Sequence, residues 1–196
     1  KQVEAVVEGE FGQSLLKELE DIGYVGLGFG NFGFRHTTNS KHPINSVEDM
    51  KGLKIRTMTT PIHLEVFEAL GANPTPMAFS ELFSALQQGV VDGAEQPIAN
   101  YKSNAFQEVA PNLILDGHTL GAIQVIITDE AWDKLTEAQQ NILMEAGKVA
   151  SEFNRTISEE AENKVLEELK ADGINVVEVP DIKPWQDACK DIIESS

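Results

Sequence analysis

Arginine is the residue type in this sequence best suited to binding a small anion. Arg56 ends a short, otherwise apolar segment that is predicted to be a strand, and α/β folds place ligands at strand ends. Its planar guanidinium fits a carboxylate in a way that the lysine ammonium does not, and the chain holds only three arginines against twelve lysines. Arg35 lies in a glycine-rich stretch that we expect to form a loop entering the same region. These two side chains predict a site for an organic anion, with an ion pair to a protein carboxylate as the alternative for each.

Three further residues have less specific signals. Arg155 lies within a predicted helix beside Glu152 and Glu159, where an ion pair on the helix surface is the expected role. Phe79 begins another predicted helix, so its ring is a candidate for facing a cleft, with a place in the hydrophobic core as the alternative. Gln96 precedes a proline at a strand-to-helix junction, where its amide is placed to donate to a ligand oxygen.

The sequence carries no recognisable catalytic or metal-binding motif. Its four histidines form neither HxxxH nor HExxH, and Cys189 is the single cysteine, so neither an internal disulfide nor a cysteine metal site is expected. A nucleophile elbow and a P-loop are both absent. An α/β enzyme using Asp92 and Glu95 as acid and base is an alternative, because both carboxylates lie on a predicted turn that could reach the same cleft. We expect a binding protein that is not an enzyme and uses no cofactor and no metal.

The amino-acid composition excludes some classes of binding partner. The net charge of -17 argues against nucleic acid and against an anionic membrane surface, since both attract clustered basic residues. The hydrophobic share of 41% is enough for a folded core, and a chain this acidic is expected to be a soluble monomer when complete. A site for an anion on such a chain needs locally concentrated positive charge.

Hydrophobic periodicity predicts strands that alternate with helices, which favours an α/β fold with a largely parallel sheet. The segment 30–46 is predicted to be a loop because of its glycine, asparagine and proline residues. Thr136 and Gln139 form a capping box that begins a helix of about 50 Å, too long for one small domain. This helix is expected to bridge two lobes that are hinged like a clam.

Several ordered segments resemble the signature of the DctP-type TRAP transporter solute receptors, and the resemblance covers essentially the whole chain. These segments are 30–38, 43–52, 52–57, 71–97, 109–119 and 132–136, together with the long helix. The resemblance implies a two-lobed periplasmic-binding-protein-like clam with a long helix spanning both lobes.

It further implies that the first lobe is incomplete, because members of the family carry a leader and about half of that lobe before the point where this chain starts. On this basis 1–30 and 122–150 are expected to form the remainder of lobe I. Lobe II is expected to comprise 31–121 and 151–196, with the inter-lobe helix and the C-terminal strand and helix.

The resemblance also implies roles for the candidate residues. Arg56 matches the arginine that forms the defining salt bridge to the ligand carboxylate, and Arg35 matches a second cation of the cleft. Phe79 matches an aromatic residue that packs on the ligand, and Gln96 falls where members commonly carry asparagine.

The implied function is that of an extracytoplasmic receptor, periplasmic or lipid-anchored, which binds a small organic anion, either a carboxylate or a sugar acid. The receptor would close on the ligand and deliver it to a small and a large integral membrane subunit of a TRAP transporter. A receptor that reports to a membrane sensor is the alternative, and the sequence leaves the identity of the ligand open.

Overall fold

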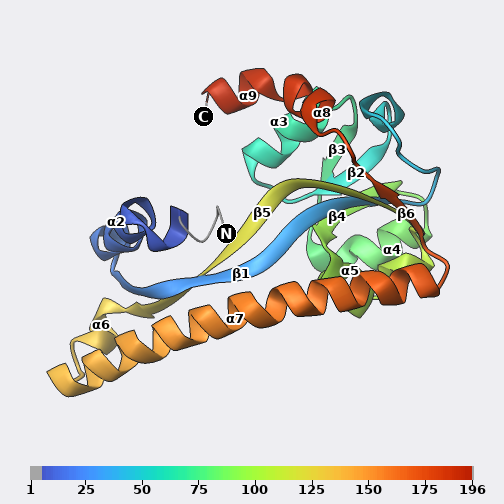
Figure 1. Ribbon diagram of the computed structural model, residues 1–196. Helices are drawn as coiled ribbons and strands as arrows, with labels where there is room; N and C mark the ends of the chain where they lie inside the picture. Colours follow the sequence, from blue (N-terminus) through green and yellow to red (C-terminus); the bar gives the residue numbers. More distant parts are fainter. Residues whose placement is uncertain (1–5, 196) are drawn as a thin grey trace. The chain divides into compact units, whose positions relative to one another are not determined.

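The computed structural model describes residues 6–195 of the chain, and its elements are drawn in Figure 1. The helices are α2 (Glu10–Glu18), α3 (Pro61–Ala69), α4 (Leu82–Gln87), α5 (Ile98–Ser103), α6 (Asp129–Trp132), α7 (Glu137–Ala171), α8 (Lys183–Ala188) and α9 (Lys190–Ser195). The strands are β1 (Tyr24–Asn39), β2 (Lys54–Thr57), β3 (Asn73–Pro76), β4 (Gly93–Pro97), β5 (Asn112–Thr128) and β6 (Asn175–Glu178). Short 3₁₀ helices cover Leu19–Ile22, Val47–Met50, Phe79–Glu81 and Phe106–Glu108.

Within the described residues the strands form one six-stranded sheet in the order β3-β2-β4-β1-β5-β6. Strand β2 is parallel to both β3 and β4, and β5 is parallel to β6. Strand β1 runs antiparallel to β4, with Arg35 opposite Pro97 and Asn39 opposite Gly93. The predicted α/β class is confirmed, while the sheet is mixed because the segment after Gly30 is a strand that sequence analysis had assigned to a loop.

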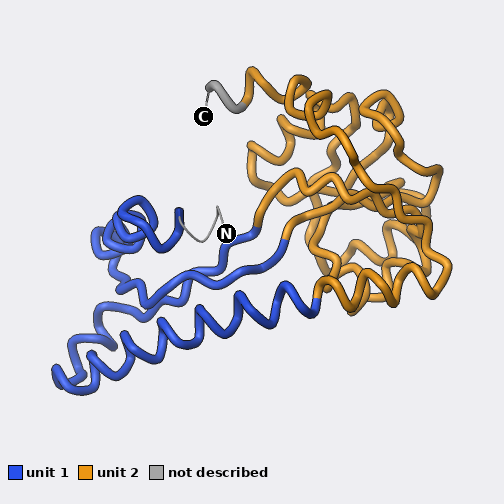
Figure 2. The backbone as a smooth tube through the Cα atoms, viewed as in Figure 1, with its two compact units in different colours: residues 1–33, 121–161 blue, residues 34–120, 162–196 orange. Residues whose placement is uncertain are grey.

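The chain divides into two compact units, which Figure 2 colours separately. Unit 1 comprises 1–33 and 121–161, and unit 2 comprises 34–120 and 162–196. The chain therefore passes between the units after Gly33, Leu120 and Ala161, whereas the boundaries predicted from the sequence follow residues 30, 121 and 150. The assignment of these units to the lobes of a receptor stays a prediction.

Unit 2 has two hydrophobic clusters that lie on opposite faces of its part of the sheet. The first contains Leu82, Leu86, Tyr101, Phe106, Leu113 and Leu169, and the second contains Ile44, Met50, Ile55, Phe67, Ile114 and Trp185. The adjacent β5 residues Leu113 and Ile114 belong to different clusters because successive side chains of a strand point to opposite faces. Burial on both faces fixes the register of the strands that carry the candidate site residues.

Helix α7 begins with the predicted capping box. The Thr136 N–H donates to Gln139 Oε1 at 2.8 Å, and the Gln139 N–H donates to Thr136 Oγ1 at 3.4 Å. Further along the helix, Arg155 donates to the Phe29 carbonyl at 2.9 Å and pairs with the Glu8 carboxylate. The expected ion pair of Arg155 is present, with a partner distant in sequence instead of a neighbour on the helix.

Glycine residues allow the unit 1 part of α7 to lie directly on β1. A Cβ atom at Gly147 would lie 2.6 Å from the Leu27 carbonyl oxygen, and one at Gly28 would lie 2.5 Å from Ser151 Oγ. Asn154 completes this contact by accepting the Asn31 N–H at 2.6 Å. Gly30, one of the glycines that predicted a loop, also lies close to α7, because a Cβ atom there would lie 2.8 Å from Asn154 Oδ1.

We predict that Gly147→Ala destabilises the protein by about 1–3 kcal/mol, because the added methyl group overlaps the backbone of β1. Intrinsic helix propensity alone predicts the opposite sign, since alanine is favoured over glycine in a helix by about 1 kcal/mol. Denaturant unfolding followed by circular dichroism measures the change. The control is Ala138→Gly at an exposed position of the same helix, where only propensity acts. A neutral or stabilising Gly147→Ala variant would contradict the packing argument.

Candidate ligand-binding site

The predicted site residues gather at one edge of the sheet in unit 2. Strands β2 and β4 are parallel, with Arg56 paired to Ala94, so their carboxyl ends lie at the same edge. The antiparallel pairing of β1 with β4 places Arg35 opposite Pro97 and His36 opposite Gln96 at that edge as well. Carboxyl ends of parallel strands are the usual ligand-binding edge of α/β folds.

Arg56 is a buried cation without a carboxylate partner. The residue is 5% exposed, and it donates from Nε and Nη2 to the Met77 carbonyl at 3.1 and 2.8 Å. Its guanidinium carbon lies 5.7 Å from the centre of the Phe79 ring, in the geometry of a cation–π contact. Among residues 6–195, no carboxylate lies within salt-bridge distance of Arg56, and its Nη1 has no hydrogen-bond partner.

The pKa of the Arg56 guanidinium is shifted because the group is buried without a paired carboxylate. Burial lowers the pKa of the guanidinium, the Glu95 carboxylate partly restores it, and the charge of Arg35 lowers it further. The group still stays protonated near neutral pH, because the ordinary pKa of an arginine side chain lies far above neutrality. A buried positive charge that lacks a counter-ion is costly, so this edge favours an anion.

The guanidinium of Arg35 forms an ion pair with a protein carboxylate, that of Glu95. Its Nε pairs with Glu95 Oε2, while its Nη2 donates to Glu95 Oε1 at 2.9 Å and to the Glu95 carbonyl at 2.7 Å. Both side chains are buried, with 8% of Arg35 and none of Glu95 exposed. Arg35 lies in β1, not in the predicted loop, and the ion pair that was its alternative role is present. Its Nη1 has no hydrogen-bond partner within the described chain.

His118 and Asp116 extend this pair into a buried network. His118 Nδ1 lies 3.0 Å from Asp116 Oδ2, and its Nε2 lies 3.4 Å from Glu95 Oε2. Asp116 also accepts the Thr37 N–H at 3.1 Å and the Thr37 hydroxyl at 2.7 Å. The network therefore links β1, β4 and β5 through side chains that are almost entirely shielded from solvent.

Opposite charges set the protonation of this network. Burial alone would lower the pKa of His118, but Asp116 and Glu95 outweigh it and raise that pKa to about 9. Burial would likewise raise the pKa of Asp116 and Glu95, yet the hydrogen bonds and charges of their cationic partners hold both below their ordinary values. At neutral pH the network contains two cations, Arg35 and His118, balanced by two carboxylates.

Two more histidines border the network. His63 Nδ1 lies 3.8 Å from Glu95 Oε2, and burial lowers the pKa of His63 despite the attraction of that carboxylate. His36 Nδ1 accepts the Gly117 N–H at 3.0 Å, and its Nε2 faces Glu162 at 3.9 Å. The ring of His118 packs edge-on against Phe67, with ring centres 5.2 Å apart.

Phe79 and Gln96 complete the predicted set. Phe79 is 39% exposed, while one edge of its ring packs on Phe106 with centres 5.6 Å apart, so it belongs partly to the core and partly to the surface beside Arg56. Gln96 is 1% exposed, and its Nε2 donates to Thr38 Oγ1 at 3.1 Å. The ligand-binding role of all four residues stays a prediction.

Asp92 and Glu95, the acid and base of the alternative enzyme hypothesis, each contact partners of their own. Asp92 accepts the Lys54 N–H at 2.9 Å and lies 3.2 Å from Lys41 Nζ. These contacts keep the pKa of Asp92 low although burial acts to raise it. Glu95 is bound by Arg35 and His118 as described. Both carboxylates therefore have structural partners of their own, and neither is paired with the other.

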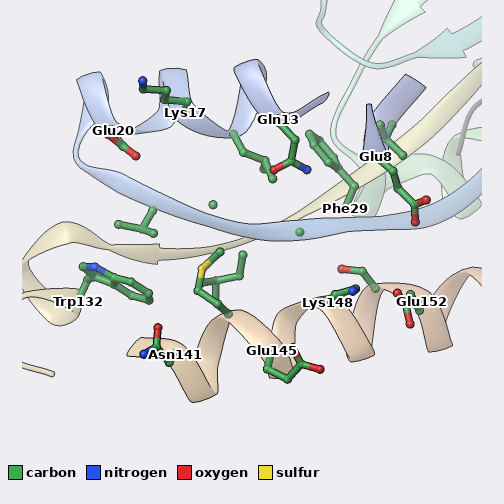
Figure 3. A pocket seen from close by; sticks show the side chains of 18 of the residues that line it. Glu8, Gln13, Lys17, Glu20, Phe29, Trp132, Asn141, Glu145, Lys148 and Glu152 are labelled. Carbon is green, nitrogen blue, oxygen red and sulfur yellow. The ribbon is translucent and has the colours of Figure 1, made fainter. Parts of the chain in front are cut away.

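A hollow of the described chain lies elsewhere, in unit 1. It has a volume of 1210 Å³ and is lined by Phe29, Trp132, Met144, Lys148, Glu152 and Arg155, among others (Figure 3). Among the described residues of unit 1, eleven large apolar side chains are exposed, whereas the buried apolar residues are Leu16 and Phe29. None of the predicted site residues lines this hollow. The apolar exposure is typical of a surface on which other polypeptide packs, not of a site for a polar anion.

Within residues 6–195 no group of three or more histidine, cysteine, aspartate and glutamate side chains is arranged to hold a metal ion. In the same part of the chain, no helix combines the length and the apolar composition needed to cross a bilayer.

Residues 1–196 match the model of the bacterial extracellular solute-binding proteins of family 7, DctP, and the chain belongs to this family. The sialic acid-binding periplasmic protein SiaP of Vibrio cholerae is 37% identical over 183 residues, which are 92% of this chain and 56% of SiaP. The predicted membership of the DctP-type receptors is thereby confirmed.

Solved structures of TRAP periplasmic solute-binding proteins are also similar to this chain. A TRAP periplasmic solute-binding protein from Sulfitobacter with bound β-D-galacturonate is 34% identical, with a TM-score of 0.94 over 99% of this chain and 64% of that protein. Another from Polaromonas, bound to D-erythronate, is 39% identical, with a TM-score of 0.92 over 98% of this chain and 64% of that protein. The chain therefore spans less than two thirds of the length of each of these relatives.

The partners of the predicted site residues are not among the predictions from the sequence. Glu95 precedes Gln96 in the chain but was considered only as a general acid or base, and His118 was assigned no role. A signal was available, because Asp116 directly follows the apolar run 113–115, and a carboxylate that becomes buried beside such a run requires a partner. The pairing itself joins residues 60 positions apart in the chain.

We predict that the protein loses stability as the pH rises from about 6.5 to about 9. The pKa of His118 is raised in the folded state to about 9, so the unfolded chain releases this proton first and the folded state is penalised across that interval. The loss should be as much as about 3 kcal/mol, complete once the pH exceeds the folded pKa. Urea unfolding at intervals between pH 6 and pH 10 measures it.

The variant His118→Gln provides the control, because it removes the titrating group while retaining a side chain that can hydrogen-bond. Its stability should change little over the same interval. A wild-type profile that is flat between pH 6.5 and pH 9, or a variant that keeps the wild-type slope, would contradict the assignment.

Proposed function

We propose that this chain serves as an extracytoplasmic receptor that binds a small organic anion, with Arg56 as the anchor for its carboxylate. Arg35, Phe79 and Gln96 surround that anchor, and the protein delivers the anion to the membrane subunits of a TRAP transporter. The family of the chain supports the receptor role, and a solved relative that carries β-D-galacturonate supports an acid as the ligand.

The isolation of Arg56 is the observation that carries this proposal. Arg35 is paired with Glu95 and His118 with Asp116, so the positive charges of the buried network are balanced within the protein. Arg56 contributes one further positive charge, and within the described residues the Met77 carbonyl accepts its hydrogen bonds and the Phe79 ring lies over it, with no carboxylate in salt-bridge distance. One carboxylate bound to its free Nη1 neutralises this edge, so a ligand with a single carboxylate fits the charge best.

Phe79 and Arg35 have complementary roles in this proposal. The partly exposed ring of Phe79 covers the guanidinium of Arg56 and offers an apolar surface to the carbon skeleton of the ligand. Arg35 contributes its Nη1 and a positive field, while Glu95 holds its guanidinium in one orientation. Such rigid support lowers the entropic cost of binding.

Delivery to a small and a large integral membrane subunit, and a periplasmic or lipid-anchored location, belong to the same proposal. Membership of an extracellular solute-binding family supports a location outside the cytoplasm. The name of SiaP, which places that relative in the periplasm, supports it as well.

Arg56→Lys is predicted to weaken binding of a carboxylate ligand by about tenfold or more, because an ammonium cannot hold the Met77 carbonyl and a carboxylate in one plane. Isothermal titration with β-D-galacturonate, D-erythronate and N-acetylneuraminate gives the affinities, and the tightest of the three serves for the comparison of variants.

The matched control is Arg155→Lys, which changes another partly buried arginine in unit 1, away from the proposed site. It should bind the same acid with wild-type affinity. Unchanged affinity in Arg56→Lys, with both variants folded by circular dichroism, would refute the anchor assignment. An equal loss in both variants would show that the effect is not local to Arg56.

A further inference from the structure

His63 is a buried histidine whose ring is held by no hydrogen bond. It is the third residue of α3, the helix that follows β2 in the chain, and it is 7% exposed. Its Nδ1 lies 3.8 Å from Glu95 Oε2, beyond hydrogen-bond distance, and the ring has no hydrogen-bond partner within residues 6–195. His118, in contrast, is fixed by Asp116 at 3.0 Å. The ring of His63 can therefore gain or lose a proton without breaking an existing bond.

The charges that face His63 come from four strands and are mainly positive. Glu95 in β4 attracts a proton to the ring, and three cations repel it, which are Arg35 in β1, Arg56 in β2 and His118 in β5. Glu95 cannot compensate for all of them, because its Oε2 already pairs with Arg35 and faces His118. Burial lowers the pKa of His63, Glu95 partly restores it, and the three cations lower it further. In the free protein the ring is therefore neutral at pH 7.

An anion at Arg56 changes this balance of charge. A carboxylate beside the guanidinium cancels one of the three positive charges that repel a proton from His63. Charges in a buried site interact strongly, because little water screens them. The affinity of His63 for a proton therefore rises when the anion binds. Since coupling between two binding equilibria is reciprocal, a proton on His63 raises the affinity for the anion by the same factor.

We propose that His63 takes up a proton when a carboxylate binds at Arg56, so that the protein binds the anion more tightly as the pH falls. This inference rests on the proposed function, because it assumes an anion at Arg56. The proton comes from the buffer and returns to it when the anion leaves. Below the pKa of His63 in the free protein the ring is protonated in both states, and above its pKa in the complex the ring is neutral in both. The affinity therefore changes between these two pKa values and is constant outside them.

Calorimetry counts the protons directly. The purified 196-residue chain is titrated with β-D-galacturonate, D-erythronate and N-acetylneuraminate, and the acid that binds most tightly is then titrated in PIPES and in Bis-Tris at intervals between about pH 5.5 and pH 8. These buffers differ in heat of ionisation, so the difference in measured heat gives the protons taken up per anion. The acids stay ionised over this interval, so the proton binds to the protein.

We expect a clear net uptake with a maximum of one proton per anion. The association constant should rise as the pH falls through the interval, by at most about tenfold per pH unit, which is the limit for one proton.

Three variants attribute the proton to His63. His63→Gln has a side chain that does not titrate, so proton uptake should vanish and the affinity should become independent of pH over the interval. His42→Gln is the control, because His42 is exposed in the loop after β1, and it should keep the wild-type uptake. His36→Gln changes the other histidine at the border of the network, retains an acceptor for the Gly117 N–H, and should keep the uptake as well. Melting temperatures establish that each variant is folded.

NMR tests the same point without a change at His63. The chain has four histidines, and the spectra of His36→Gln and His42→Gln identify two of the ring C2–H resonances. The resonance of His118 keeps the chemical shift of a protonated ring up to about pH 8, because the pKa of His118 is raised to about 9. The remaining resonance, that of His63, should report a neutral ring at pH 7 in the free chain. Its titration midpoint should move to higher pH when the acid is added.

The outcomes separate the two proposals. If the acid binds without proton uptake, or if it leaves the NMR midpoint of His63 unchanged, the role of His63 is wrong while the receptor function stands. Uptake that persists in His63→Gln, or that disappears in His36→Gln or His42→Gln, assigns the proton to another group and also rejects the inference. If none of the three acids binds the wild-type chain, the proposed function fails and the inference fails with it.

Discussion

The pairing of Arg35 with Glu95 is the interaction on which the candidate site depends. A buried carboxylate would be costly alone, but Glu95 is bound by the guanidinium of Arg35 and faced by His118, which Asp116 keeps protonated. These groups balance one another in charge and join three strands. Arg56 is left as the cation that no carboxylate of the described chain satisfies. The same network thus holds the edge of the sheet together and concentrates positive charge at one position.

The architecture of unit 2 makes this separation of roles possible. Alternation along β4 sends Glu95 toward Arg35 and His118 and sends Gln96 toward Thr38 and the face that carries Arg56. Hydrophobic clusters on both faces prevent the strands from slipping by one residue, which would exchange these two environments. The charged Arg56 and the neutral Gln96 can therefore occupy neighbouring strands without competing for the same hydrogen-bond partners.

Unit 1 is organised by a different constraint, the close approach of a helix to a strand. Gly28 in β1 and Gly147 in α7 lack the side chains that would keep the two elements apart, and Arg155 and Asn154 bond to the backbone of β1. Much of the remaining apolar surface of this unit is exposed. The hollow of unit 1 is lined by apolar side chains together with charged ones such as Lys148, Glu152 and Arg155.

The sequence by itself determined the α/β class, the long capped helix and the family, because these follow from local periodicity, capping residues and ordered motifs. It did not determine that the segment around Arg35 is a strand, since glycines that permit close packing look like glycines of a loop. Only the tertiary structure decided that Arg35 pairs with Glu95, that Asp116 and Glu95 keep His118 charged, and that Gln96 turns its amide toward Thr38. These contacts join residues that are distant along the chain, and their partners are selected by strand register and burial, which no local pattern specifies.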